Sequence, residues 1–172
     1  MSSSPKCSRQ DLLDFLASLN IETKTYDHDA VFTVSESHKI KQHLPGGHTK
    51  NLFLKDKKGK MVLVVCLNDT EVDLKSFHHK YACGRVSFCN ADLLWEHLGV
   101  RPGSVTPFAL INDKDSNIVN LVLDANLMKE ELVNFHPLEN TATTAIARED
   151  LLRFLDATGH VPTILALEKE PG

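Results

Sequence analysis

The chain has 172 residues, a formal net charge of −4 and four cysteines. This length suits one globular domain with its own core, and the weakly acidic balance argues against a general nucleic-acid coating protein. The longest apolar run, Met61–Leu67, is far shorter than the roughly 20 residues that span a bilayer, and the polar start of the chain is no targeting signal. We therefore expect a cytoplasmic protein with reduced thiols and no membrane segment.

The N-terminal half is predicted to contain a helix over residues 8–20, a strand over 21–28 and a short helix over 35–42. The two strands of a hairpin follow over 51–55 and 61–67. Ser8 and Asp11 form a capping pattern at the start of the first helix. Pro45-Gly46-Gly47 breaks the chain after the second helix. The last strand is apolar enough to be central in a sheet.

The C-terminal half is predicted to begin with two helices, over residues 73–81 and 90–98, and a second hairpin, over 108–111 with 118–123. Two further strands over 132–138 and 141–146, a helix over 148–158 and a closing strand over 162–167 follow. Asp73 and Asn90 are the expected N-caps, and Gly99 and Gly159 the expected stops. Because the strand pairs are mostly hairpins, we expect an α/β fold, α+β in the strict sense, with a mixed, largely antiparallel sheet flanked by helices.

We find no repeat and no linker in this order of elements. The sequence therefore predicts a single domain over residues 8–167. A flexible N-terminus over 1–7 and a C-terminal tail over 168–172 flank it.

The stretch that says most about function reads Gly-Gly-His-Thr-Lys-Asn-Leu-Phe-Leu, residues 46–54. Lys50 and Asn51 are expected where a flexible loop becomes an apolar strand, a place where a scaffold presents polar groups to a ligand. A lysine there can act as a point charge for phosphate, or be tuned by burial for chemistry. A Gly-rich turn followed by a solvated lysine explains the same residues without a function.

Two further segments are candidates for chemistry. Residues 99–107 hold two glycines and two prolines, so this restricted loop can present backbone N–H groups to an oxyanion or carboxylate. His136, before Pro137, can orient a water or a substrate carbonyl. The structural alternatives are a rigid connection and a turn residue. The cysteines form no CxxC pair and the histidines match no zinc pattern, so we expect no metal, no cofactor and no catalytic cysteine.

Basic residues gather between Lys39 and Lys60, a stretch of seven lysines that holds a single acid, Asp56. In an acidic protein, one local basic stretch suits contact with a few phosphates beside a specific pocket. An ordinary solvated face is the alternative interpretation.

The start of the 51–55 strand, the Gly103–Pro107 loop with its GxxxP pattern, and the Phe135-His136-Pro137 turn occur in this order along the chain. In combination they resemble the YbaK family of aminoacyl-tRNA deacylases, the domain that also forms the editing insertion of bacterial prolyl-tRNA synthetase. The resemblance covers about residues 8–167, and it is greatest to the freestanding eukaryotic, alanine-specific branch called ProXp-ala. It implies a YbaK-like fold.

The resemblance also implies an activity, the trans-editing of tRNA. The chain would hydrolyse the ester that joins a wrong amino acid, most readily alanine, to the terminal adenosine of tRNA for proline. A synthetase pocket for proline cannot strongly exclude alanine by binding, because each missing methylene is worth only roughly 1–3 kcal/mol. The implied partners are the acceptor end of this tRNA and prolyl-tRNA synthetase.

Each motif then has an implied role. Lys50 holds the 3′-terminal nucleotide, Asn51 fixes the substrate, and a water assisted by a ribose hydroxyl attacks the ester. Backbone amides of the loop hold the carbonyl oxygen as it gains charge, and His136 lines or orders the pocket. The implied catalytic residues are Lys50, Asn51, Gly103, Ser104 and His136. The implied substrate-binding residues are Val31, Phe32, Val34, Val105, Thr106 and Pro107. Phosphate contacts, which position the tRNA, are assigned to Lys39, Lys41, Lys57 and Lys58.

Two other functions stay open at this point. The chain could be a non-catalytic module that binds tRNA or a synthetase on the same scaffold. It could also remove cysteine or serine instead of alanine, because the motifs above do not distinguish the amino acid.

Overall fold

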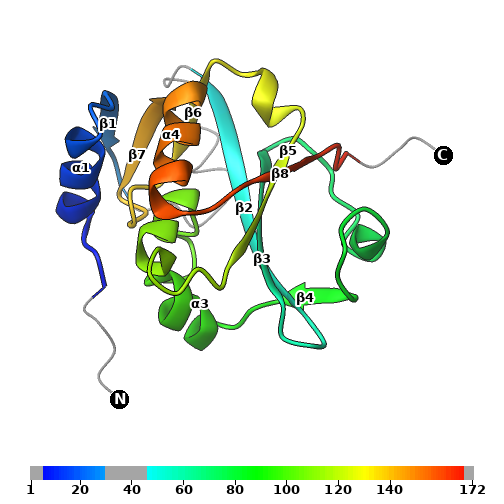
Figure 1. Ribbon diagram of the computed structural model, residues 1–172. Coiled ribbons are helices and arrows are strands. Elements are labelled where there is room, and N and C mark those ends of the chain that lie inside the picture. The colour runs from blue at the N-terminus through cyan, green and yellow to red at the C-terminus, as the bar shows by residue number, and fades with distance from the viewer. Residues whose placement is uncertain (1–5, 30–45, 169–172) are drawn as a thin grey trace.

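The computed structural model describes residues 6–29 and 46–168, which form one mixed sheet with helices packed against it (Figure 1). The described α-helices are α1 (Arg9–Ser18), α3 (Ala91–Leu98) and α4 (Arg148–Thr158). The strands are β1 (Thr23–Asp27), β2 (Gly47–Asp56), β3 (Met61–Leu67), β4 (Val86–Phe88), β5 (Asn120–Asp124), β6 (Leu132–Phe135), β7 (Ala142–Ala147) and β8 (Thr163–Leu165). Three 3₁₀ turns lie between them, η1 (Phe77–His79), η2 (Pro107–Asp113) and η3 (Leu127–Lys129).

The sheet runs in the order β1-β7-β6-β2-β3-β5-β8, and β4 pairs with β2 outside this path. Among the described strands, β1/β7, β6/β7, β2/β3 and β2/β4 are antiparallel. The pairs β2/β6, β3/β5 and β5/β8 are parallel. The predicted α/β fold with a mixed, largely antiparallel sheet is therefore confirmed.

Local signals explain where the helices begin and end. The Ser8 side chain accepts a hydrogen bond from the Asp11 N–H, and the Asp11 carboxylate accepts one from the Ser8 N–H, which makes the predicted capping box. Asn90 caps α3, which ends at Gly99 with φ +66°. Gly159, with φ +82°, ends α4 in the same left-handed conformation.

The core lies on both faces of the central strands, because alternate residues of a strand point to opposite faces. Phe53, Leu63 and Val65 point to the face covered by the helices, where aromatic rings meet edge to face. The alternate residues of the same strands, among them Leu54 and Val64, pack on the opposite face in a smaller cluster.

Two predicted elements are wrong. Residues 108–111 are not a strand but part of η2, because Pro107 and the Thr106 side chain, which accepts from the Phe108 N–H, start a turn there. A short buried apolar run cannot be assigned to strand or helix by its pattern alone. As a result β5 has no hairpin partner and instead pairs in parallel with β3.

The helix expected over 73–81 is the second correction, because only the three residues of η1 are helical there. Asp73 accepts hydrogen bonds from the Lys75 N–H and the Ser76 hydroxyl, and this local turn competes with a helix. The helix predicted over 35–42 lies outside the described residues. The predicted domain limits stay a prediction.

Candidate functional site

One edge of β2 has a short gap, a stretch between two pairing strands that is itself not paired with any described strand. β3 pairs along one edge of β2 from Thr49 to Lys55. On the other edge, β6 pairs at Gly47 and His48, and β4 pairs at Leu54–Asp56. No described strand pairs with that edge between these two points, at Lys50–Leu52. Unpaired backbone groups at a strand edge are open to hydrogen bonds from a ligand or another chain.

The gap corrects the expected position of Lys50 and Asn51. β2 begins at Gly47, so both residues lie inside the strand and not where a loop becomes a strand. Gly47 is packed rather than flexible, because a Cβ there would lie 2.9 Å from the Glu130 Cγ. Lys50 pairs across the sheet with Cys66, and Asn51 pairs with Val65, so the two side chains point to opposite faces.

The Asn51 side chain carries an unused acceptor. Its Oδ1 is buried and has no hydrogen-bond partner among the described residues. A buried acceptor left without a partner costs about 1–3 kcal/mol, so native proteins rarely keep one without a reason. A donor supplied by a ligand would remove this cost.

His136 follows β6 on the side of the gap. The parallel register of Gly47 with Val133 and of His48 with Asn134 directs the next residues of β6 along β2 toward Lys50. The Thr49 hydroxyl donates to the Asn134 carbonyl at 2.7 Å, so the contact between β2 and β6 extends one residue along β2 beyond His48. His136 Nδ1 donates to the Ala142 carbonyl at 3.0 Å, so the proton sits on Nδ1 and the ring orientation is fixed.

The Gly103–Pro107 loop is shaped by turns at both ends. Gly103 has φ +92°, a conformation that only glycine adopts without strain. The Ser104 amide donates to the Arg101 carbonyl at 3.0 Å, so it is already engaged. Within the described parts of the chain, the amides of Gly103, Val105 and Thr106 have no recorded acceptor. These three N–H groups, and not that of Ser104, are the available donors.

The loop and the end of β6 are in contact through their aromatic neighbours. Phe108, directly after Pro107, packs edge to face against Phe135 with ring centroids 5.6 Å apart. Phe135 precedes His136 in the chain. The structure thus brings together the Gly103–Pro107 loop and the Phe135-His136-Pro137 turn. The register of β2 with β6 adds the third predicted segment, the one that holds Lys50 and Asn51.

The cysteines offer no nucleophile. Burial raises the pKa of the Cys66 thiol to about 11, although the nearby Lys50 ammonium acts in the opposite direction. Burial is also the main cause of the raised pKa of the other three thiols, Cys7, Cys83 and Cys89. All four are therefore protonated at neutral pH, and thiolate chemistry is unavailable to them.

The two described lysines among those assigned to tRNA lie far from Lys50. Lys57 and Lys58 are exposed in the β2–β3 turn, at the other end of β2 from Gly47 (Figure 1). At about 3.3 Å per residue, this turn is roughly 20 Å from Lys50. The Asp56 carboxylate accepts from the Lys58 and Lys60 N–H groups, so part of the basic stretch has a structural purpose. The other assigned residues, Val31, Phe32, Val34, Lys39 and Lys41, lie outside the described residues.

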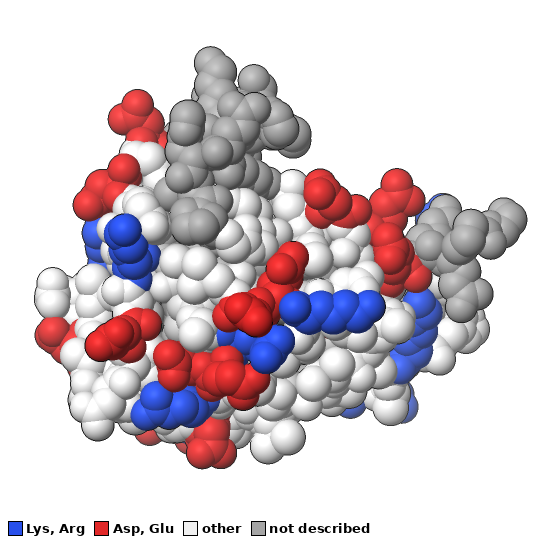
Figure 2. All heavy atoms as spheres, turned by 90° about the horizontal axis from the view of Figure 1, so that it is seen from above, with Lys and Arg blue, Asp and Glu red and all other residues white. Residues whose placement is uncertain are grey.

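Charge is mixed on the face seen in Figure 2. Acidic and basic side chains alternate across its described atoms, and no continuous basic surface covers it. General attraction to a phosphate backbone is therefore weak on this side, and a contact there depends on a few placed groups.

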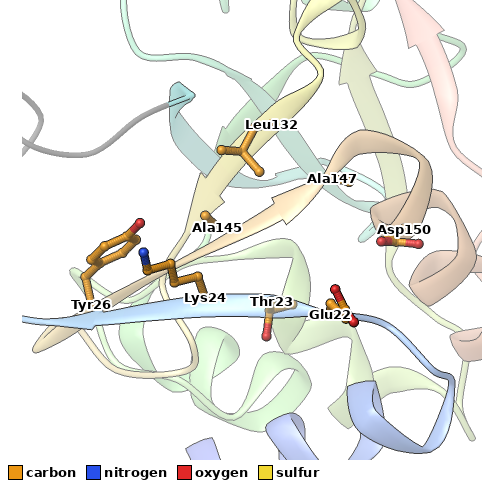
Figure 3. A pocket seen from close by; sticks show the side chains of 8 residues that line it. All are labelled: Glu22, Thr23, Lys24, Tyr26, Leu132, Ala145, Ala147 and Asp150. Carbon is orange, nitrogen blue, oxygen red and sulfur yellow. The ribbon is translucent and has the colours of Figure 1, made fainter.

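A hollow of about 510 Å³ near the β1 edge of the sheet was not predicted (Figure 3). Lys24 lies over the Tyr26 ring, 5.3 Å from its centroid, at one end of the hollow, and Glu22 and Asp150 lie at the other. The small side chains of Ala145 and Ala147 form its floor. The signal for this hollow in the sequence is the alternation of small residues along the strand.

The chain matches a family model and several known proteins. The model of the aminoacyl-tRNA editing domain matches residues 28–154, more than half of the chain. Prolyl-tRNA synthetase associated domain-containing protein 1 of Danio rerio is 41% identical over 162 residues, which cover 93% of this chain and 88% of the relative. The prolyl-tRNA editing protein ProX of Acetoanaerobium sticklandii is 35% identical over 162 residues, which cover 94% of this chain and 97% of ProX.

The fold is also that of a solved editing protein. The crystal structure of a proposed trans-editing enzyme for prolyl-tRNA synthetase superposes with a TM-score of 0.67 at 20% identity. The superposition covers 98% of this chain and 100% of that one. At this identity the match shows the fold.

None of the helices described is both long and apolar enough to pass through a membrane. Nowhere in residues 6–29 and 46–168 do three or more His, Cys, Asp or Glu side chains gather as a metal site would require.

Proposed function

The chain belongs to the aminoacyl-tRNA editing domain family, and we propose that it is a trans-editing deacylase that hydrolyses the ester of tRNA for proline mischarged with alanine. The observation that carries the proposal is the gap at Lys50–Leu52, which lies on one edge of β2 between the residues that pair with β6 and those that pair with β4. Relatives over nearly the whole chain are named for prolyl-tRNA editing or for association with prolyl-tRNA synthetase.

The gap explains how Lys50 and Asn51 can act on one substrate from opposite faces. A ligand that lies along an open strand edge touches both faces of the strand at once, as well as its backbone groups. In our proposal the Lys50 ammonium holds the phosphate or ribose of the terminal nucleotide. The Asn51 Oδ1, which has no partner among the described residues, accepts a hydrogen bond from the substrate.

The reaction itself is an ester hydrolysis without a protein nucleophile. The oxygen of a water attacks the carbonyl carbon while the neighbouring ribose hydroxyl of the substrate relays the proton of the water to the ribose oxygen that leaves. The carbonyl oxygen becomes an oxyanion, which the amides of Gly103, Val105 and Thr106 stabilise. The bond from the carbonyl carbon to the ribose oxygen then breaks, and this oxygen is protonated as the tRNA leaves. An aminoacyl ester is already activated, so positioning and oxyanion stabilisation are sufficient.

His136 orients the substrate or the water in this scheme. Its Nδ1 donates to the Ala142 carbonyl. In the neutral ring, Nε2 is then an acceptor for a water or a substrate hydroxyl. A ring fixed in this way can hold a water against the ester without accepting its proton.

The amino acid preference is tested by a hydrolysis assay with tRNA for proline charged with alanine, cysteine, serine or proline. We expect fast cleavage of the alanine ester and none of the proline ester above the uncatalysed rate. Preferred cleavage of the cysteine or serine ester would assign the same reaction to another substrate. If the protein binds tRNA and cleaves no ester, it is a binding module and the proposal is wrong.

The proposed partner beyond tRNA is prolyl-tRNA synthetase, after the name of the relative in Danio rerio. A complex with the synthetase would let the chain receive a mischarged tRNA before it is released. Co-purification of the two proteins with and without tRNA tests this separately from the hydrolysis assay.

A further inference from the structure

A second pocket lies beside the Gly103–Pro107 loop, between the end of α3 and the turn that joins β6 to β7. Its volume is about 290 Å³, near the small end of the range for ligand pockets in proteins. Nine residues line it, namely Trp95, Gly99, Val100, Arg101, Pro102, Ser104, Leu138, Glu139 and Asn140. None of the roles assigned above uses its aromatic or basic residues.

The main feature of this pocket is a stack of Arg101 on Trp95. The guanidinium carbon lies 3.9 Å from the centroid of the indole ring. Trp95 belongs to α3 and is 38% exposed, so part of its indole ring is accessible to a ligand. A planar cation over an exposed indole is a ready surface for a further planar ring.

The two walls of the pocket come from segments of the candidate active site. Ser104 belongs to the loop that supplies the oxyanion donors. Leu138, on the other wall, is two residues after His136 and has φ +70°. A non-glycine residue in this left-handed conformation is held there by its surroundings at some cost, a feature that clusters at functional sites. The pocket is therefore a direct extension of the site.

The pocket is lined by charges of both signs, and its guanidinium has no counter-charge among the described residues. Arg101 takes part in none of the ion pairs of the described chain. Lys6 lies beside Gly99 of the lining, where a Cβ would be 3.0 Å from the Lys6 Cδ, and its Nζ donates to the Glu96 carbonyl at 2.7 Å. The acid in the lining, Glu139, lies 2.9 Å from Arg9 and shares this guanidinium with Asp27, which lies 2.7 Å from it. The guanidinium without an ion-pair partner favours an anionic ligand.

We propose that this pocket binds an unpaired nucleobase of the tRNA 3′ end, stacked against the Arg101–Trp95 pair, while Lys6 and Arg101 contact the flanking phosphate. The inference rests on the proposed function for the identity of the nucleic acid. Single-stranded ends are recognised by stacking of splayed bases on aromatic rings and guanidinium planes, which is what the pocket offers. Anchoring one base here would fix the position of the ester at the gap in β2.

A fluorescence titration tests the pocket without any need for catalysis. Trp95 is the single tryptophan of the chain, so its emission reports on this pocket alone. We expect quenching on titration with an RNA oligonucleotide ending in ACCA, and about tenfold weaker binding to Arg101→Ala. The matched control is Arg153→Ala, an exposed arginine on α4, which should bind as the wild type does.

The identity of the bound base comes from shortened probes. Equal quenching by adenosine monophosphate would place the terminal adenine in the pocket, and quenching that needs the longer oligonucleotide would place a cytosine there. Either result supports the proposal. Equal binding of an abasic probe would overturn it, because phosphate contacts alone would then explain the affinity. Unaltered binding to Arg101→Ala would overturn it as well.

Steady-state hydrolysis of charged tRNA separates this inference from the proposed function. Trp95→Ala should raise KM about tenfold and alter kcat less than threefold, whereas Ile164→Ala on the far edge strand should alter neither. If wild type cleaves no ester and the oligonucleotide still quenches Trp95, the proposed function fails and the pocket stands. If cleavage is normal and Trp95→Ala has no effect on KM, the pocket fails alone.

Discussion

The protein contains two clusters of polar groups that differ in the completeness of their hydrogen bonds. At the end of α4, His160 Nε2 lies 2.8 Å from Asp113 Oδ2, and His160 Nδ1 lies 2.8 Å from the Thr158 hydroxyl. The same Asp113 carboxylate accepts from the Ile118 and Val119 N–H groups. Every polar group of this first cluster has a partner inside the protein.

The gap in β2 is the opposite case. The buried Asn51 Oδ1 has no hydrogen-bond partner among the described residues, and in the Gly103–Pro107 loop the amides of the exposed Gly103, the half-buried Val105 and the buried Thr106 donate to none of them either. The two clusters therefore serve different purposes. Polar groups that are fully satisfied fix the fold, and polar groups left without partners beside a family motif are kept for a ligand.

The largest expected effect is on catalysis at the gap. Lys50→Ala should reduce single-turnover cleavage of the alanine ester at least 100-fold, because the ammonium is the charge that places the tRNA end. Lys55→Ala, on the same strand and on the other face, is the matched control and should lose less than threefold. Equal losses in the two variants would show that cleavage needs positive charge anywhere on β2, and not the Lys50 ammonium in particular.

The satisfied cluster should respond in stability instead. Asp113→Ala leaves one imidazole and two backbone N–H groups buried without an acceptor, so we expect the free energy of unfolding to fall by about 3 kcal/mol. Denaturant titration measures this change. Ester cleavage, assayed well below the midpoint of unfolding, should stay within twofold of wild type. A large loss of activity would contradict the separation of the two clusters.

A smaller effect is expected at Gly103. An alanine at φ +92° costs about 1–2 kcal/mol, and relief of this strain would turn the loop amides away from the oxyanion. Gly103→Ala should therefore lower kcat roughly tenfold. Gly59→Ala, at a similar φ of +89° in the β2–β3 turn, carries the same strain away from the site and should lower stability without lowering kcat.

The smallest effect concerns acid stability at Asp56. Hydrogen bonds from the Gly84 N–H, and then from the Lys60 N–H, lower the pKa of this carboxylate below its ordinary value of 3.8. Its contribution to stability is thus present above pH 3.8 and is lost as the pH falls through the lowered pKa. Asp56→Asn should show a shallower loss of stability between about pH 5 and pH 2. Parallel curves for the two proteins would contradict this cause.

Much of the fold could be predicted because its signals are local. The capping box at Ser8, the left-handed glycines after α3 and α4, and the apolar β3 each depend on a few neighbouring residues. The prediction failed where the outcome depends on distant partners. β5 pairs in parallel with β3, a contact between segments about 60 residues apart, so no local pattern indicates it.

The site shows the same limit. The motifs identified segments that the fold brings together, but the gap at Lys50–Leu52 exists because β6 and β4 pair with separate parts of one edge of β2, which the sequence does not reveal. The opposite orientation of Lys50 and Asn51 follows from the early start of β2 at Gly47. Arg101 and Trp95 stack because α3 ends in a turn at Gly99, and composition alone gives no hint of it.

One variant tests the central claim most directly, because it separates ligand binding from folding in a single side chain. Asn51→Leu replaces the buried acceptor without a partner by an apolar group of similar size. We predict that the free energy of unfolding stays equal or rises by up to about 1 kcal/mol, while cleavage of alanine-charged tRNA for proline falls at least tenfold. A loss of stability with unaltered cleavage would show that Asn51 serves the fold, and would contradict the account.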